Sequence, residues 1–100
     1  MNKVIKIKES DIHSHIKARM KQRGISMEEI QAVLTKGWNA DDAVGGTIGK
    51  VFVFPYKAEW EGNSFEEKEV TVYYKYKDKQ FILLTAKARY GKEFLRREDK

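Results

Sequence analysis

The sequence predicts an α+β domain in which two N-terminal helices pack on one face of an antiparallel sheet, with the element order β-α-α-β-β-β. Two amphipathic helical segments, each ending at a glycine, lie within residues 10–37. Segments that alternate apolar and polar residues follow them and are separated by short turns. Helices grouped before a run of strands are typical of this fold class.

The first expected strand is the segment 4–8, where isoleucines alternate with lysines. A helix then extends through Arg23, with Ser10 or Asp11 as its N-cap, and Gly24 allows the left-handed conformation that ends it. Its apolar stripe consists of residues four positions apart, namely Ile12, Ile16 and Met20.

The second helix carries a capping box at its start. The side chain of Ser26 can accept from the third backbone N–H while Glu29 reaches back to the cap. The helix is expected to end before Gly37, and its apolar stripe consists of Ile30, Val33 and Leu34.

Three strands are expected in the second half of the chain, at residues 47–54, 70–77 and 80–89. Pro55 has no N–H for a ladder, so the first of these strands lies at an edge or is broken there. A turn cluster at 61–64 and a tight turn at Asp78-Lys79 separate the strands.

Alternation assigns the strand faces. The expected core face holds Val70, Val72, Tyr74, Tyr76, Ile82, Leu84, Ala86 and Ala88. The opposite face then combines cations with an aromatic ring and holds Tyr73, Lys75, Lys77, Thr85, Lys87 and Arg89. Because cations neutralise phosphates and a tyrosine ring offers a stacking surface, this face is a candidate for binding RNA. A solvated sheet face with no ligand is the alternative.

Composition and length set the class of protein. A chain of 100 residues has room for one domain, so residues 1–100 are interpreted as a single unit with a charged tail at 91–100. The absence of cysteine excludes disulfides, thiolate metal sites and cysteine nucleophiles. No apolar run approaches membrane-spanning length or resembles a signal peptide, so we expect a cytoplasmic protein that does not contact a membrane.

The net charge of +5 is unevenly distributed along the chain. Residues 1–23 carry 7 basic and 2 acidic side chains, and residues 79–100 carry 7 and 3. The middle segment, residues 24–78, carries 6 basic and 10 acidic side chains. If folding brings the two ends together, they form a positive surface that attracts a polyanion such as RNA.

One line of residues on the first helix could carry chemistry. His15, Arg19 and Arg23 recur every four residues and therefore lie along one side of the helix. A histidine can exchange a proton with a ribose hydroxyl, and guanidinium groups bind phosphate, so this line could cleave RNA without a metal ion. The alternative is a boundary stripe whose arginines pair with acidic residues of the middle segment.

Other familiar sites are not indicated, and we expect no cofactor. His13 is two residues from His15, which is the wrong spacing for two histidines on a helix to share a metal ion. Asp41 and Asp42 are interpreted as turn residues because they lack the alternating ligands of a calcium loop. The glycines at 45–49 lead into a strand, unlike those of a phosphate-binding loop.

The segment 15–26, HIKARMKQRGIS, resembles the signature H-x-x-x-R-M-x-x-R-G-I-S of a small bacterial and phage family catalogued as a domain of unknown function. Further features of that family match Glu28-Glu29, Gly37 and Thr85. The resemblance covers roughly residues 12–90, and only the helical signature is specific. The family is thought to be related to RelE/ParE-like toxins, which share the helix-then-sheet order.

The resemblance implies a RelE-like fold and a toxin-like ribonuclease. It implies a site formed by His15, Arg19, Arg23 and Thr85, and it adds Tyr90 to the basic strand residues Lys87 and Arg89. An acidic antitoxin-like protein is the partner that it implies. Members of the ParE branch act on a protein and do not cleave RNA.

The sequence supports two functional hypotheses. The first is a metal-independent endoribonuclease of toxin type, in which His15 is the general acid or base, Arg19 and Arg23 bind the phosphate, and Thr85 positions the substrate. The second is a non-catalytic module on the same fold that binds RNA or a protein. A small structural or phage accessory protein remains a third alternative.

Overall fold

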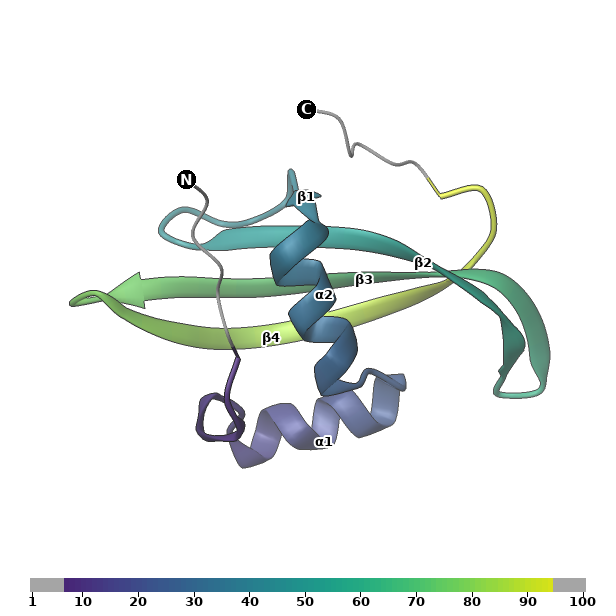
Figure 1. Cartoon of the computed structure of the whole chain (residues 1–100), viewed down its shortest axis with the longest axis horizontal. Coiled ribbons are helices and arrows are strands. Elements are labelled where there is room, and N and C mark those ends of the chain that lie inside the picture. The colour runs from purple at the N-terminus through teal and green to yellow at the C-terminus, as the bar shows by residue number, and fades with distance from the viewer. Residues whose placement is uncertain (1–6, 95–100) are drawn as a thin grey trace.

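The computed structural model describes residues 7–94 as two helices and one sheet (Figure 1). The sheet is antiparallel, with its strands in the order β1-β2-β3-β4. Both helices contribute to the core cluster against the sheet, which confirms the α+β class and the position of the helices. The elements are η1 (Glu9–Asp11), α1 (Ser14–Arg23), α2 (Met27–Lys36), β1 (Trp38–Asn39), β2 (Ile48–Trp60), β3 (Asn63–Lys77) and β4 (Gln80–Gly91).

The expected order β-α-α-β-β-β is wrong at its start, because the described chain runs α-α-β-β-β-β. Residues 4–6 of the expected first strand lie outside the described residues, and Ile7 and Lys8 are not in a strand. The backbone N–H of Ile7 donates to Oε1 of Gln31 at 2.8 Å, and that of Lys8 donates to Oδ2 of Asp11 at 2.8 Å. Side chains thus take the hydrogen bonds that a neighbouring strand would have made.

Helix α1 begins at Ser14, later than expected, because residues 9–11 form a separate 3-10 turn and His13 becomes the N-cap. The expected end is confirmed: Gly24 has φ of 71° and its N–H donates to the carbonyl of Lys21. The expected stripe is also confirmed, since Ile12, Ile16 and Met20 are all buried.

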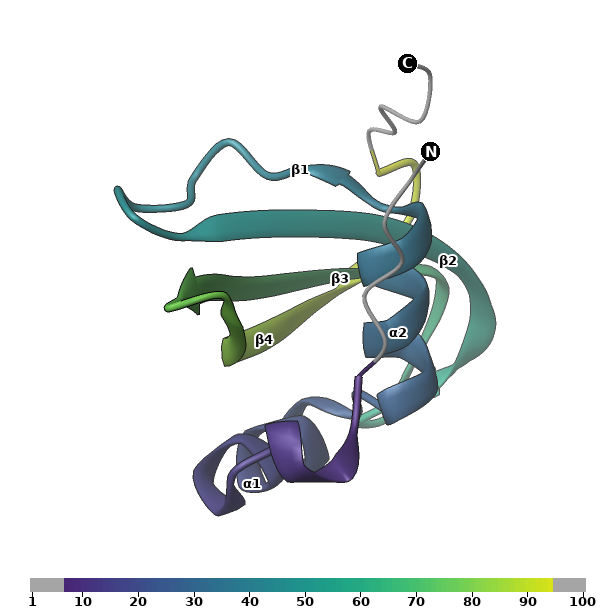
Figure 2. The ribbon, with the colours of Figure 1, turned by 60° about the vertical axis from the view of Figure 1, so that its left-hand side comes forward.

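The capping box of α2 is confirmed at both of its hydrogen bonds. The N–H of Glu29 donates to Oγ of Ser26 at 3.1 Å, and the N–H of Ser26 donates to Oε1 of Glu29 at 3.0 Å. The stripe of Ile30, Val33 and Leu34 is buried. Figures 1 and 2 show α2 crossing the strands over one face, while α1 lies beside the edge strand β4.

Strands β2 and β3 are longer than expected and form a hairpin closed by Glu61 and Gly62, both with positive φ. Strand β1 pairs only with residues 50 and 51 of β2, so at Pro55 the strand β2 is at the edge of the sheet. The register also shifts between Pro55 and Ala58. Both consequences expected of the proline, a local edge and an interruption, are therefore found.

The core face of β4 was predicted only in part. Ala86 and Leu83 are buried, at 1% and 2% exposed, whereas Ile82 and Leu84 are half-buried. Tyr73 pairs with Thr85 and the next residue, Tyr74, pairs with Leu83, so Leu84 is the extra residue of a β-bulge. The bulge reverses the alternation before it and turns Leu83, in place of its neighbours, toward the helices.

The expected core residues of β3 fit the structure better. Val70, Val72 and Tyr74 are buried, but Tyr76 is 48% exposed because it lies near the end of the β3–β4 hairpin. The tight turn at Asp78-Lys79 is confirmed, with φ of 53° and 66°.

Candidate functional site

The four residues of the expected catalytic site lie on different surfaces. His15 and Arg19 are exposed on α1. Arg23 is half-buried and donates from Nη1 to the backbone carbonyl of Ala86 at 2.6 Å, which ties α1 to the edge strand β4. Thr85 pairs with Tyr73 on the face of the sheet turned away from the helices. The structure therefore does not bring Thr85 to the helical line.

The two histidines lie closer together than a helix would have placed them. His13 is the N-cap and is not part of α1, so its ring lies parallel to that of His15, with centroids 6.0 Å apart. Both side chains are exposed. Arg19 follows His15 by one helical turn, so a cation stands next to the imidazoles.

We call the face of the sheet opposite α1 and α2 the open sheet face. The strand register places most of the expected RNA-binding residues there. Tyr73 pairs with Thr85, Thr71 with Lys87, and Glu69 with Arg89. The expected residues on this face are therefore Tyr73, Lys75, Lys77, Thr85, Lys87 and Arg89.

Carboxylates neutralise the two cations at the centre of the open sheet face. Lys87 donates to Oδ2 of Asp42 at 3.1 Å, and Arg89 donates from Nε to Oε1 of Glu69 at 2.8 Å. The hydroxyl of Tyr73 donates to Oδ1 of Asp42 at 2.8 Å, and the Lys87 ammonium lies 5.4 Å from the centroid of its ring.

These contacts shift the titration of the groups that make them. The hydrogen bonds from Tyr73 and Lys87 lower the pKa of Asp42 below its usual value. The pKa of Lys87 is raised by its hydrogen bonds to Tyr73 and Asp42, and that of Arg89 is raised by its bond to Glu69. Asp42, Lys87 and Arg89 are thus charged at neutral pH, and the carboxylate partners make the face much less positive than its lysines and arginines alone indicate.

Tyr90 lies on the face of the sheet that packs against the helices. The family resemblance groups it with Lys87 and Arg89, which lie on the open sheet face. Tyr90 pairs with the buried Lys68, and its hydroxyl donates to the backbone carbonyl of Arg23 at 2.6 Å. Its ring stacks on that of Trp60, with centroids 4.9 Å apart. Tyr90 therefore holds the end of α1 against the sheet and is not adjacent to Lys87 or Arg89.

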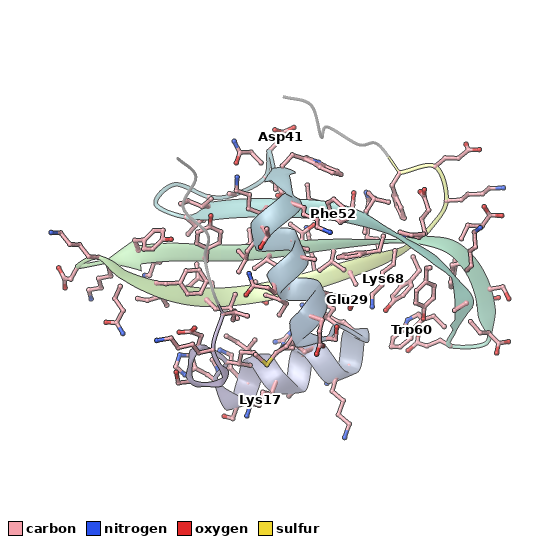
Figure 3. All side chains as sticks on the ribbon, viewed as in Figure 1. Lys17, Glu29, Asp41, Phe52, Trp60 and Lys68 are labelled. Carbon is pink, nitrogen blue, oxygen red and sulfur yellow. The ribbon has the colours of Figure 1, made fainter. Side chains whose placement is uncertain are left out.

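A buried ion pair next to Tyr90 was missed by sequence reasoning. Lys68 is 3% exposed, and its ammonium donates to both carboxylate oxygens of Glu29, at 2.8 and 2.9 Å, and to the carbonyl of Gly24. Figure 3 shows Lys68 and Glu29 next to each other, beside α2. The rings of Tyr56 and Tyr90 lie 5.6 and 5.5 Å from the ammonium. The signal available in the sequence was the position of Lys68, which lies between Glu67 and Glu69 and two residues before the inward-facing Val70.

Helix α1 is the element whose positive charge is least neutralised. It carries Lys17, Arg19, Lys21 and Arg23 and no acidic residue. The first three are exposed, and Arg19 and Lys21 form no ion pair with any residue in the described range 7–94.

Two kinds of feature are absent from residues 7–94, a metal-binding cluster and a membrane-spanning helix. Among residues 7–94, no group of three or more histidine, aspartate or glutamate side chains is arranged to hold a metal ion. No helix in that range is long and apolar enough to cross a membrane.

Comparison with known proteins gave no match to a family model, to a curated protein or to a solved structure. The resemblance of residues 15–26 to a toxin-related family therefore stays a prediction, as does an acidic protein partner. The function of the chain is inferred from its own geometry.

Proposed function

We propose that this domain is an RNA-binding module that contacts the phosphate backbone through the exposed face of α1. The observation that carries the proposal is the composition of that helix, which has four lysines and arginines within ten residues and no acid. Sequence-independent affinity for nucleic acid comes mainly from neutralised phosphates, so exposed cations without an acidic neighbour on their own helix are the feature that such binding requires.

The distribution of ion pairs also favours the exposed face of α1 over the open sheet face as the RNA-binding surface. Arg19 and Lys21 make no ion pair within residues 7–94, so a phosphate does not have to displace a carboxylate. On the open sheet face, Lys87 and Arg89 already have carboxylate partners. A polyanion approaching there would meet Asp42 and Glu69 together with the two cations, which reduces the net attraction.

The test is binding of a labelled single-stranded RNA, followed by fluorescence anisotropy over a range of salt concentrations. We expect log K to fall linearly with log salt, with a slope that becomes smaller by about 0.7 for each of Arg19→Ala and Lys21→Ala. Both side chains are exposed, so circular dichroism should show an unchanged fold. The matched controls are Lys75→Ala and Lys77→Ala, which remove one charge each from the open sheet face outside its pocket.

Two results would overturn the proposal. One is binding that does not depend on salt, and the other is a loss in the sheet-face variants equal to or larger than the loss in the α1 variants. The second result would move the RNA to the open sheet face and restore the prediction made from the sequence.

The ribonuclease hypothesis keeps one supporting observation, the parallel and exposed rings of His13 and His15 beside Arg19. One imidazole can accept the proton of the ribose 2′-hydroxyl as its oxygen attacks the phosphorus, and the other, in its protonated form, can donate a proton to the 5′-oxygen as the phosphorus–oxygen bond breaks. These two transfers are sufficient for cleavage without a metal ion. This candidate predicts cleavage of RNA in EDTA that is abolished by His15→Ala while the affinity measured by anisotropy is retained. If the RNA is still intact after prolonged incubation, the ribonuclease hypothesis is wrong and RNA binding is the only activity that remains proposed.

A further inference from the structure

A pocket of about 390 Å³ lies on the open sheet face, beneath the segment that follows β1. Its walls come from Trp38 to Asp42, and its floor includes Val51 of β2, Glu69 of β3, and Lys87 and Arg89 of β4. Figure 3 shows Asp41 at the opposite side of the molecule from Lys17 on α1. The pocket is therefore separate from the surface proposed to bind RNA, and it needs its own explanation.

Two cations in the pocket are held in place and still have hydrogen-bond donors to offer. Arg89 uses Nε for Glu69, and its guanidinium carbon lies 5.0 Å from the ring centroid of Phe94, which fixes the plane of the group. Its two terminal nitrogens make no hydrogen bond to a residue of the described range. Arg89 and Lys87 are both about half exposed or more, so an anion can reach them.

The opposite wall of the pocket is aromatic and polar. The indole of Trp38 is half-buried and is held by Phe52, with ring centroids 5.8 Å apart. Next to it, Asn39 contributes an amide to the lining. A flat ring beside an amide is suited to a heterocycle whose edge carries amino and carbonyl groups.

We propose that this pocket binds a nucleoside monophosphate unit, with its phosphate on Arg89 and Lys87 and its base against the indole of Trp38. The phosphate and the base each account for one part of the pocket lining. An inorganic anion would contact only the cations and would leave Trp38 and Asn39 without a ligand group. The volume lies in the range of small-molecule sites and exceeds what inorganic phosphate fills. Asp42 and Glu69 lower the long-range attraction for an anion, so the affinity for the phosphate has to come from short hydrogen bonds donated by the two terminal nitrogens of Arg89, which Glu69 does not use.

The experiment uses tryptophan fluorescence in a Trp60→Phe background, which leaves Trp38 as the only tryptophan. The ligands are the four ribonucleoside monophosphates, inorganic phosphate, and a single-stranded RNA tetranucleotide. We expect saturable quenching by at least one monophosphate, weakened about tenfold or more by Arg89→Ala because a charge-assisted hydrogen bond is lost. The matched control is Lys77→Ala, which removes a cation from the same face outside the pocket.

The same set of ligands distinguishes a free nucleotide from a nucleotide that is part of an RNA chain. Tighter binding of the tetranucleotide, with the same loss in Arg89→Ala, identifies a nucleotide within RNA, whereas a preference for the monophosphate identifies a free nucleotide. Calorimetry with Trp38→Leu should show reduced affinity for nucleotides and unchanged affinity for inorganic phosphate.

Three results would overturn the proposal: no binding of any nucleotide, equal affinity for nucleotides and inorganic phosphate, or full affinity in the Arg89→Ala variant. None of them bears on the contribution of Arg19 and Lys21 to RNA binding, so the two proposals fail independently.

Discussion

The pair formed by Lys68 and Glu29 provides the sharpest test of how this fold is held together. Replacing Lys68 by Met keeps an unbranched side chain between the rings of Tyr56 and Tyr90 but leaves the Glu29 carboxylate without its cation. Removing one member of a buried pair costs about 3–5 kcal/mol. Glu29 is 22% exposed and keeps its bond from Ser26, so water offsets part of that cost, and we expect a loss of about 3 kcal/mol.

The reciprocal variant is Glu29→Gln. Glutamine can also complete a capping box, so this change removes the charge and retains the cap. The ammonium of Lys68 then keeps only the Gly24 carbonyl and its aromatic neighbours, at 3% exposure, and we expect a loss of at least about 3 kcal/mol. In the double variant neither charge is left alone, so its loss should be smaller than the sum of the two by about 1–3 kcal/mol.

The assay is urea denaturation of the two single variants, the double variant and a control, with the slope m compared across all of them. The control is Lys87→Met, because both side chains of the 3.1 Å bridge between Lys87 and Asp42 are well exposed, at 48% and 59%. It should cost less than about 1 kcal/mol. A loss for Lys68→Met no larger than that of the control would refute the assignment of Lys68 as a buried anchor.

Three further predictions concern the junction of α1 with the sheet. Gly24→Ala should lower the free energy of unfolding in urea by about 2–4 kcal/mol, because φ is 71° and a Cβ would lie 2.6 Å from the Trp60 ring and 2.7 Å from the Tyr90 hydroxyl. An unchanged free energy of unfolding would contradict this packing. Arg23→Ala should lose about 1.5 kcal/mol with its bond to Ala86, and Arg23→Lys should recover only part of it in the same assay. Burial raises the pKa of Tyr90 to about 12, so its contribution to stability is complete below pH 10 and is lost as pH rises from 10 to 12. Ultraviolet titration should show a component that ionises near pH 12 and that Tyr90→Phe removes.

Local signals explain why the helices could be predicted from the sequence. The end of α1 depends on Gly24, and the start of α2 depends on Ser26 and Glu29, which are contacts between residues close in the chain. The start of α1 was less accurate because no side chain caps it, and the 3-10 turn before it is fixed by a bond from Lys8 to Asp11.

The bulge at Leu84 shows what the sequence pattern could not reveal. The run Phe81 to Leu84 is apolar at every position, so alternation gives no preference for either face. The register is decided by packing against the helices, where Leu83 fills the core beside Tyr74. The faces of Thr85, Lys87 and Arg89 were predicted correctly because these residues lie beyond the bulge, where alternation is regular.

The candidate site could be predicted by residue type but not by electrostatic partner. Lys87 and Arg89 lie on the expected face, but Asp42 is 45 residues from Lys87 in the chain and Glu69 is 20 from Arg89, so no local pattern links the members of either pair. Glu69 lies directly across from Arg89 in the register, which becomes visible only once the hairpin is aligned.

These pairs explain how a chain with net charge +5 comes to present its positive charge on a helix. Three acidic residues of the middle segment, Glu29, Asp42 and Glu69, bind the cations of β3 and β4. Folding thereby gives these three cations of the sheet a carboxylate partner, while α1 lies along β4 without an acid of its own. This distribution of charge is the reason that we propose the edge formed by α1 as the RNA-binding surface, and that we propose a small ligand with a phosphate for the pocket of mixed charge on the open sheet face.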